Sequence, residues 1–533
     1  MRPAKHGCLY RERMTAWTRR GLTVTGLLAS TALIWMTGGG LAAAVPRAAP
    51  PAGPGSWTVY HGSADGAGVA GSVAAVDTSA PAWTSPALDG ELYGAPLVSS
   101  GRVYVATEAD TVYALSAATG AVIWSAQLGR PVPSTDLPCG DIAPTAGITG
   151  TPVIDRSRDE IFVVADELVN GRPAHMFAGL SAASGKVEVS QDVDPPGADP
   201  AALLQRTGLA LDDGRVVFGL GGNDGDCASY RGRVIAVPEQ GGTAEMFTVD
   251  AAAGESQGAI WMGGAAPVVD SGGDIWVSAG NGSVFSSSHP YDDSDSVLEL
   301  SPSLTLVQFF APASWATDNS RDLDMSAAPA LLPDGQVVLI GKSRIAYLLN
   351  RAHLGGIGGQ QAALASACGG DTDGGVAVQG TTVYLPCTSG ITAIRAAASP
   401  AGLRLLWSSG TGGGPPIVAA GLVWTISRSG TLYGLSPATG AVRQQASIGA
   451  PANHFPTPSV ADGLLLAASA DRVVAFTASA SGSASASGSV SSSPAAGQPG
   501  GGLPSPAIVG IVIAGLAVIG WLGWLVWRRR RAV

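Results

Sequence analysis

Charge is scarce in this sequence, and lysine is nearly absent. Charged residues make up 13% of the 533 residues, and lysine occurs only at positions 5, 186 and 342. This scarcity does not suit a helical protein, whose exposed faces normally carry many charged side chains. Glycine (74 residues) and proline (36 residues) are abundant instead, which is typical of many short strands joined by tight turns. We therefore expect an all-β protein.

Several motifs of known enzyme classes are also missing. The chain has no Cys-x-x-Cys-His or His-Glu-x-x-His motif, and its folded region has no Gly-x-Ser-x-Gly turn. Gly335–Ser343 resembles a phosphate-binding loop, but five residues separate its glycines where four are needed. Tyr291–Asp295 is acidic but lacks the glycine and glutamate of a calcium-binding EF-hand loop. We interpret the first stretch as a strand and the second as a solvated loop.

The stretch Gly101–Trp124 indicates how the fold is built. It contains two runs of alternating apolar residues, 103–106 and 112–115, and this alternation is typical of strands with one buried face. Thr119-Gly120 then predicts a turn into a third strand, 121–124. The stretch therefore predicts three strands of a four-stranded antiparallel sheet.

Copies of this unit recur along the chain. The closest copy, Gly430–Val442, repeats the pattern Tyr-x-Leu-Ser-x-Ala-Thr-Gly. Eight such units predict an eight-bladed β-propeller with four-stranded antiparallel blades. The eighth unit lacks a fourth strand, and we expect a strand near residues 82–84 to supply it, because closing the ring removes an open sheet edge. Counterparts of the strand that carries Tyr113 lie at Ala178, Ile235, Leu298, Tyr347, Ile394, Tyr433 and Val474.

Residues 1–44 predict a secretory signal peptide. Basic residues precede an apolar segment from Leu22 to about Leu41, and three alanines at 42–44 follow as a cleavage site. Residues 18–22 weakly resemble a twin-arginine signal, so general secretion and twin-arginine export both stay open. Met14 is an alternative start of translation.

The other end of the chain predicts a membrane anchor. Residues 507–527 carry no charge and are long enough to span a bilayer as a helix, and the basic tail 528–533 should hold that end in the cytoplasm. Residues 478–506, rich in Ser, Gly, Ala and Pro, predict a disordered stalk. The layout resembles a sortase-anchored protein, but residues 503–507 lack the Thr-Gly pair that such enzymes cut. We expect a plasma-membrane-anchored protein whose ectodomain, 45–477, lies outside the cytoplasm.

The exported part of the chain is acidic. Without the signal peptide and the basic tail it keeps 39 acidic and 20 basic residues, a net charge near −19. Nucleic-acid binding requires a basic face, so this charge argues against such a partner. We expect a monomer that contacts the membrane through its C-terminal helix and an unknown protein or small-molecule ligand at the propeller axis.

Four cysteines remain after removal of the signal peptide, which contains Cys8. An even number in an oxidising compartment predicts two disulfides, with three possible pairings. We favour Cys139–Cys227 and Cys368–Cys387, and free buried thiols are the alternative.

The repeat itself resembles a known family. Val112–Trp124 reads Val-Tyr-Ala-Leu-x-Ala-x-Thr-Gly-x-x-x-Trp, which is similar to the repeat of pyrroloquinoline quinone (PQQ) propellers. That family includes quinoprotein alcohol dehydrogenases and non-catalytic members such as the outer-membrane assembly lipoprotein. The resemblance covers roughly residues 56–477 and implies the propeller fold, whereas the repeat motif alone implies no activity.

The resemblance to the dehydrogenases implies a PQQ and Ca²⁺ site in blades four and five. Asn281, in a Gly-Asn turn, would be a Ca²⁺ ligand, and Asp324 or Asp322 would be the catalytic base. Lys342 would contact the quinone oxygens, and Trp261 would form the floor under the ring. A carboxylate ligand for Ca²⁺ should come from an early blade, and the candidates are Glu167 and Asp226.

The chain also departs from the dehydrogenase pattern, because it lacks the two adjacent cysteines that often lie over the cofactor. The same residues have an ordinary structural interpretation: Asn281 makes a turn, the two aspartates cap turns, Lys342 is solvated and Trp261 belongs to the core. We therefore favour a cell-surface binding or scaffold module, with a PQQ- and Ca²⁺-dependent dehydrogenase of a small alcohol as the alternative.

Overall fold

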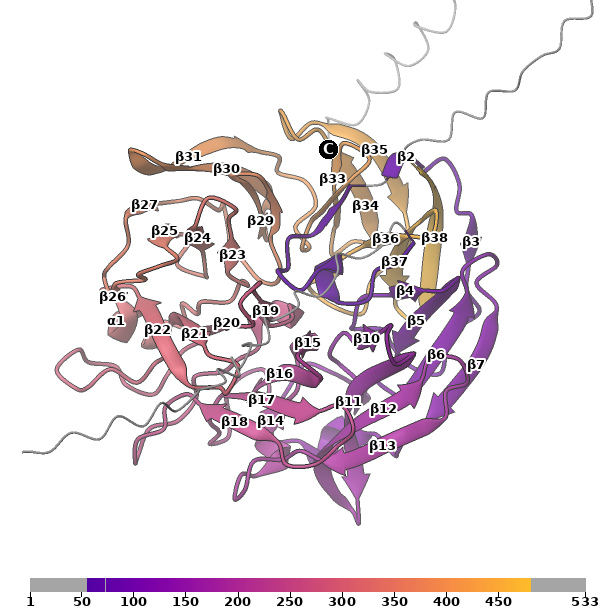
Figure 1. The fold of residues 1–533 in the computed structure, drawn as a ribbon, viewed down its shortest axis with the longest axis horizontal. Coiled ribbons are helices and arrows are strands. Elements are labelled where there is room, and N and C mark those ends of the chain that lie inside the picture. Colours follow the sequence, from indigo (N-terminus) through magenta and orange to yellow (C-terminus); the bar gives the residue numbers. More distant parts are fainter. Residues whose placement is uncertain (1–54, 72, 481–533) are drawn as a thin grey trace, which may run out of the picture. The chain divides into compact units, whose positions relative to one another are not determined.

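The computed structural model describes residues 55–71 and 73–480, which form eight antiparallel sheets arranged as the blades of a ring (Figure 1). The predicted all-β, eight-bladed propeller is confirmed, and the described residues contain one short α-helix, α1 (Trp315–Asn319). The predicted signal peptide and C-terminal helix, 1–44 and 507–527, lie outside the described residues. Within the described ranges, no helix combines the length and apolar character needed to cross a membrane.

In seven of the blades, the four principal strands follow the chain from the axis outward. The strands of blades one to four are β4 (Leu97–Ser99), β5 (Arg102–Ala106), β6 (Thr111–Ser116) and β7 (Val122–Gln127); β10 (Val153–Asp155), β11 (Glu160–Val169), β12 (Arg172–Ser181) and β13 (Val187–Asp192); β15 (Ala210–Asp212), β16 (Arg215–Gly222), β17 (Arg233–Pro238) and β18 (Glu245–Thr248); and β19 (Val268–Val269), β20 (Ile275–Ala279), β21 (Ser296–Leu300) and β22 (Leu306–Ala311).

The strands of blades five to eight are β23 (Ala330–Leu331), β24 (Gln336–Leu339), β25 (Ala346–Asn350) and β27 (Ala362–Leu364); β28 (Ala377–Gln379), β29 (Thr382–Cys387), β30 (Gly390–Ala398) and β31 (Ala401–Ser408); β32 (Ile417–Ala419), β33 (Leu422–Ile426), β34 (Thr431–Leu435) and β35 (Val442–Ser447); and β36 (Ser459–Ala461), β37 (Leu464–Ser469), β38 (Arg472–Ala480) and β2 (Val73–Asp77). Short additional elements are β1 (Val69–Ala70), β3 (Trp83–Thr84), β8 (Val132–Pro133), β9 (Thr145–Ala146), β14 (Leu203–Leu204) and β26 (Gly356–Ile357), with 3₁₀ turns η1 (Tyr60–Gly62), η2 (Ser134–Asp136), η3 (Pro200–Ala202) and η4 (Met262–Gly264).

Blade one shows why the repeat forms this sheet. The inner strand β4 is buried along its whole length, whereas the outer strand β7 alternates between exposed and half-buried residues. The two runs predicted as strands from their alternation are β5 and β6, which pair in antiparallel register. Each of the eight positions aligned with Tyr113 lies in the third strand of its blade. The repeat therefore encodes a sheet whose burial decreases from the axis outward.

The Trp and Gly of the repeat join neighbouring blades. The ring of Trp124, in blade one, lies where a Cβ on Gly185 of blade two would be, 2.5 Å from the nearest ring atom. Its indole N–H donates to the Ala182 carbonyl at 3.1 Å. Trp83 makes the same contact with Gly120, where a Cβ would lie 2.4 Å from the ring. The motif is thus a packing device that needs glycine both for this close approach and for its positive φ.

The ring closes with strands from both ends of the described chain. The predicted strand near residues 82–84 is β3, and Trp83 pairs with Ala475 of β38. A second N-terminal strand, β2, forms the outer edge of blade eight and pairs with β38 from Val73↔Ala480 to Asp77↔Thr477. Residues 478–480, which the composition assigned to the stalk, therefore continue strand β38, because β2 supplies their hydrogen-bond partners.

Residues 55–70 fill the axis of the propeller. Their backbone bonds in turn to inner strands of blades one, two, four, six and seven, at Val98, Ile154, Val269, Val378 and Val418. Tyr60 and His61 stack on each other and are 5% and 1% exposed. A cavity beside them has a volume of about 10 Å³, which is room for about one water molecule. This segment thus plugs the channel that eight inner strands would otherwise leave.

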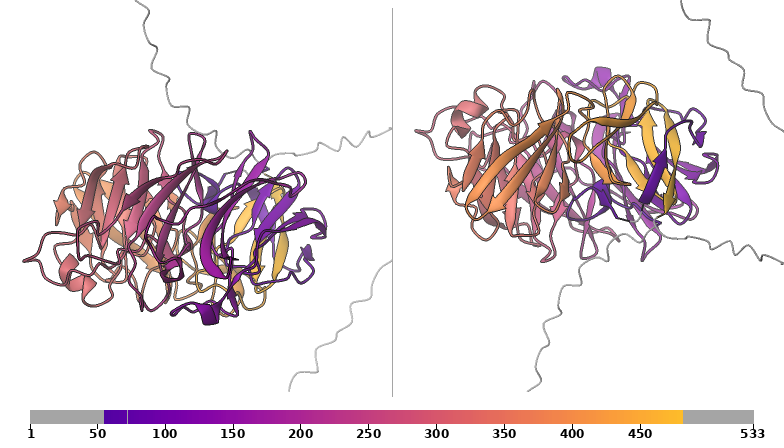
Figure 2. Two further views of the ribbon diagram at one scale, coloured as in Figure 1. Left: turned by 90° about the horizontal axis from the view of Figure 1, so that it is seen from below. Right: turned by 90° about the horizontal axis from the view of Figure 1, so that it is seen from above.

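The two faces of the ring carry different loops (Figure 2). One face, here called the site face, carries the turns between second and third strands, such as 107–110, and the connections between blades, such as 128–152. The opposite face carries the short turns between first and second strands, such as 100–101. The longest irregular segments therefore gather on the site face.

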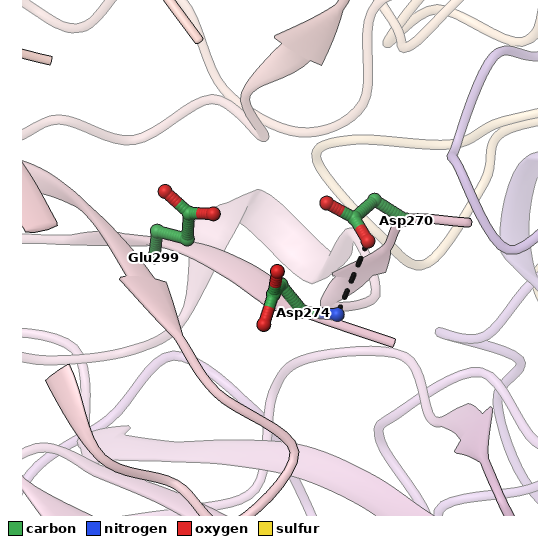
Figure 3. Close-up of side chains that lie close together, drawn as sticks. All are labelled: Asp270, Asp274 and Glu299. Atoms are coloured by element: carbon green, nitrogen blue, oxygen red, sulfur yellow. Dashed lines mark hydrogen bonds between the residues drawn. The ribbon is translucent and has the colours of Figure 1, made fainter. Parts of the chain in front are cut away.

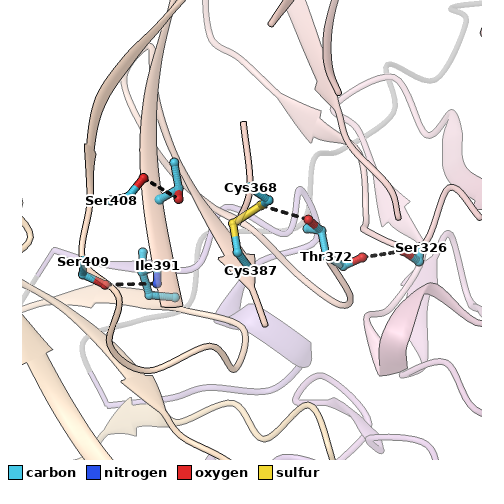
Figure 4. The surroundings of a disulfide bond; sticks show 8 residues. Ser326, Cys368, Thr372, Cys387, Ile391, Ser408 and Ser409 are labelled. Carbon is cyan, nitrogen blue, oxygen red and sulfur yellow. Dashed lines mark hydrogen bonds between the residues drawn. A yellow bond between two sulfur atoms is a disulfide. The ribbon is translucent and has the colours of Figure 1, made fainter. Parts of the chain in front are cut away.

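Two disulfides lie near the site face. Cys139 bonds to Cys227 and Cys368 bonds to Cys387, which are the pairs favoured from the sequence. The first links the connection after blade one to a turn of blade three. The second is buried between blades five and six, where the Thr372 hydroxyl donates to the Cys368 sulfur (Figure 4).

Candidate functional site

Blades four and five bring the four predicted polar residues together on the site face. The backbone N–H of Asn281 donates to Asp324 Oδ1 at 2.7 Å, and its side-chain amide donates to Asp322 Oδ1 at 2.9 Å. The Lys342 ammonium lies 2.5 Å from Asp324 Oδ2 and 2.9 Å from Asp322 Oδ1. Asn281 comes from the β20–β21 turn, the aspartates from the connection to blade five, and Lys342 from the β24–β25 turn.

The predicted floor residue, Trp261, joins this group. The Lys342 ammonium lies 5.7 Å from the centre of the Trp261 ring, a distance that allows a cation–π contact. The ring of Phe455 lies 6.0 Å from that of Trp261, tilted by 54°. The structure therefore collects Trp261, Asn281, Asp322, Asp324 and Lys342 around one place near the axis, which we call the axial site.

Charge balance in the axial site holds Lys342 protonated. Burial alone lowers the pKa of Lys342, but the adjacent Asp324 and Asp322 outweigh it and raise the pKa above its ordinary value. Burial raises the pKa of the nearby Asp373 to about 7, and the Lys342 charge opposes that rise. Asn281 is 8% exposed, and its Oδ1 has no hydrogen-bond partner. The axial site thus contains a buried oxygen acceptor beside two carboxylates.

The two candidates for an additional carboxylate ligand lie in different places. Glu167 is on β11 of blade two, where its charge contributes to the raised pKa of Asp110, a shift caused mainly by burial. Asp226, in the β16–β17 turn, is close enough for Asp324, Asp322 and Lys342 to influence its pKa, which burial raises. The structure therefore brings Asp226 to the axial site and does not bring Glu167 there.

Arg206, Tyr93, Asn453 and Phe455 also surround the axis, although no motif in the sequence marks them. The Arg206 guanidinium lies 5.8 Å from the Tyr93 ring centre and 6.0 Å from the Phe455 ring centre. Arg206 Nη2 donates to Asn453 Oδ1 at 3.0 Å. These residues lie in the connections between blades, as Trp261 does. Their position shortly before an inner strand is the one feature of the sequence that could have marked them as site candidates.

A separate acidic group lies on the opposite face of blade four. Carboxylate oxygens of Asp270, Asp274 and Glu299 lie within 4.8 Å of one another (Figure 3). Arg351 Nη2 contacts Asp270 Oδ2 at 2.5 Å, and the Trp276 indole donates to the same oxygen at 3.0 Å. Arg351 therefore supplies positive charge to this group, as Lys342 does in the axial site.

The axial site offers oxygen ligands of the kind that a hard cation prefers, while Lys342 already contacts both of its carboxylates. Ca²⁺ prefers carboxylate and amide oxygens, and Asn281 Oδ1 offers a buried acceptor without a donor next to Asp324. A flat cofactor on Trp261 would share that ring with Phe455, so it fits only where Phe455 leaves the ring face open.

Comparisons with known proteins agree with this architecture. The family model described as outer membrane protein assembly factor BamB matches residues 69–291 and 392–522. A quinohemoprotein alcohol dehydrogenase, ADHIIG, from Pseudomonas putida HK5 is 14% identical, with 80% of each chain covered and a TM-score of 0.59. BamB from Moraxella catarrhalis is 14% identical, over 76% of this chain and 100% of that one, with a TM-score of 0.51.

A europium-containing methanol dehydrogenase is 13% identical, over 80% of this chain and 98% of that one, with a TM-score of 0.59. Among curated proteins, no sequence matches the chain. At these identities the solved structures show a shared fold alone.

Proposed function

The chain belongs to the PQQ-repeat β-propeller family described as outer membrane protein assembly factor BamB, and from that premise we propose that it is a binding module of the cell envelope. The observation that carries this proposal is the axial site, where loops of several blades present half-buried aromatic and charged side chains. The axis beneath them is filled by residues 55–70. A ligand would therefore enter from the site face and stop at this plug.

Both ends of the described chain lie on the face opposite the axial site. Strand β38 ends at Ala480 beside Val73, and Gly55 lies against Asp462 in the β36–β37 turn, so both ends of the described chain leave by the opposite face. The site face is therefore clear of both ends of the described chain, which leaves it open to a ligand or partner.

Small molecules that co-purify with the full chain test the proposal. The chain is purified from detergent-solubilised membranes and denatured, and the released molecules are identified by mass spectrometry. We expect at least one compound that a Trp261→Ala, Phe455→Ala double variant does not retain, because both rings border the axial site. Identical sets of compounds from the two proteins would refute binding there.

The convergence of the predicted residues favours one second candidate, a PQQ- and Ca²⁺-dependent dehydrogenase of a small alcohol. Asn281 and Asp226 would hold the ion, and Asp322 or Asp324 would accept the alcohol proton. PQQ would supply a two-electron acceptor, and Lys342 would stabilise negative charge beside it.

This candidate is tested by adding PQQ and Ca²⁺ to the full chain and recording the absorption spectrum and dye-linked alcohol oxidation. Absence of binding at micromolar cofactor would falsify it. Binding that persists in an Asn281→Ala, Lys342→Ala double variant would place the cofactor elsewhere.

A further inference from the structure

Arg206 is a buried cation without a counterion. Its side chain lies in the connection between blades two and three and is 8% exposed, and no carboxylate of the described residues pairs with it. On the opposite face, by contrast, Arg215 contacts Asp212 and Arg351 contacts Asp270. Burying an unpaired charge costs several kcal/mol of stability. Such a cost is typical of a group that completes its pairing with a ligand.

A neutral amide holds the guanidinium in place. Asn453 Oδ1 accepts from Arg206 Nη2 and from the Phe455 backbone N–H at 2.6 Å, and Asn453 Nδ2 donates to the Tyr93 carbonyl at 2.6 Å. Asn453 therefore fixes the cation and the backbones of both flanking aromatic residues together. Within the described part of the chain, the other guanidinium N–H groups of Arg206 make no hydrogen bond, so they remain free to donate.

Nearby carboxyl groups do not neutralise Arg206 at neutral pH. Burial raises the pKa of Glu108 to about 8, so Glu108 is mostly uncharged at pH 7. Asp141 is exposed and lies 3.6 Å from His454. A second cation, the exposed Arg428, lies 5.9 Å from the centre of the Phe455 ring. Two cations, Arg206 and Arg428, therefore flank the Phe455 ring.

We propose that Arg206, beside the axial site, binds a small organic carboxylate with a flat apolar body, and this proposal rests on the binding function proposed above. The carboxylate would accept hydrogen bonds from the free N–H groups of Arg206, whose planar fork matches a carboxylate. The body of the ligand would lie against Tyr93 and Phe455, whose rings are half-buried. Asp322 and Asp324 of the neighbouring axial site would reject more highly charged anions.

Isothermal titration of the full chain with benzoate and with benzylamine tests this proposal, since the two probes share a ring and differ in charge. We expect benzoate to bind and benzylamine not to bind. Arg206→Met should weaken benzoate binding by about tenfold or more, because it removes hydrogen bonds between charged groups. The matched control, Arg404→Met, removes an exposed arginine from the outer strand β31 and should leave binding unchanged.

Thermal unfolding supplies a second readout that a purely structural role would not produce. Methionine replaces the unpaired cation with an apolar side chain of similar length, so Arg206→Met should keep or raise the Tm of the ligand-free protein. The proposal would be overturned if Arg206→Met lowered the Tm or left benzoate binding unchanged. It would also be overturned if the wild type did not bind benzoate or preferred benzylamine. If the release experiment still yields an axial compound, only the assigned ligand class fails; if it yields none, the proposed binding function fails as well.

Discussion

His175 offers the sharpest test of how charge is stabilised in this fold, through the substitution His175→Gln. The imidazole is 1% exposed on β12, with Nε2 3.0 Å from Asp166 and Nδ1 2.7 Å from Asp194. Burial lowers its pKa, but Asp166 and Asp194 outweigh burial and raise the pKa to about 9. The side chain is therefore a buried cation that balances two carboxylates at neutral pH.

Removing one partner of a buried ion pair costs about 3–5 kcal/mol. The raised pKa agrees, since a shift from 6.5 to about 9 corresponds to about 3 kcal/mol. A folded unit of this size unfolds with an entropy of about 0.9 kcal/mol/K, so His175→Gln should lower Tm by about 3–6 °C. Thermal unfolding followed by far-UV circular dichroism measures this change. The exposed His454, replaced in the same way, should change Tm by less than about 1 °C.

The pH dependence separates this charge effect from a simple packing defect. A raised folded pKa gives stabilisation that is complete below the unfolded pKa, near 6.5, and is lost as pH rises through about 9. The difference between wild type and His175→Gln should therefore narrow between about pH 6 and about pH 10. A variant as stable as wild type at about pH 6, or a difference that stays constant with pH, would refute the reasoning.

Three further predictions follow from single features of the fold. Gly120→Ala should cost about 3 kcal/mol, because a Cβ would lie 2.4 Å from an indole ring, whereas Gly101→Ala, with the same positive φ and open space, should cost only about 1 kcal/mol in urea unfolding. Loss of the bridge at Cys139, which closes 88 residues, should lower the free energy of unfolding by about 4.6 kcal/mol, against about 3.2 kcal/mol for the bridge at Cys368, which closes 19 residues; equal losses would contradict the chain-entropy argument. Burial raises the folded pKa of Glu108 to about 8, so the wild-type protein should lose stability as pH rises from about 4.5 to about 8 and this carboxyl group ionises. In chemical unfolding, Glu108→Gln should therefore be more stable than wild type by about 3–5 kcal/mol above about pH 8 and similar to it near pH 4.

The blades could be predicted from the sequence because their signal is local and repeated. The alternation around Tyr113 recurs eight times, and each copy specifies a third strand. The strand that closes the ring near Trp83 could also be predicted, because an incomplete eighth unit needs a partner for its edge. These inferences required only the period of apolar residues and the physical cost of an open sheet edge.

The plug at residues 55–70 could not be predicted in this way. Its hydrogen bonds reach from Trp57 to Val98 and from Gly68 to Val418, so its conformation depends on inner strands hundreds of residues apart. The plug has no regular spacing of apolar residues, because it follows the inside of the ring and does not form a blade. Strand β2 was missed for a similar reason, since its partner β38 lies at the far end of the folded chain.

The axial site could be predicted from the sequence only in part. Asn281, Asp322, Asp324 and Lys342 could be selected from a resemblance, and the structure brings them together. The choice between Glu167 and Asp226 required three-dimensional placement, because both are acidic residues in early blades. Arg206 is marked in the sequence only by its position before an inner strand, since its importance comes from a missing partner, which is a property of the folded structure.

The repeated strands and the loops of the site face have different structural roles, which explains why the blades could be predicted more fully than the site. Residues that repeat, such as Trp124 and Gly185, must satisfy the same packing contact at three blade boundaries, so they cannot also vary to suit a ligand. The loops of the site face have no such contact to preserve, and they hold two residues with unsatisfied groups: Asn281 Oδ1 without a donor and Arg206 without a counterion. A packed fold tolerates such groups only where something compensates their desolvation. Arg206 lies beside Tyr93 and Phe455, and Asn281 lies in the axial site with Trp261, so the site face combines unsatisfied polar groups with aromatic rings.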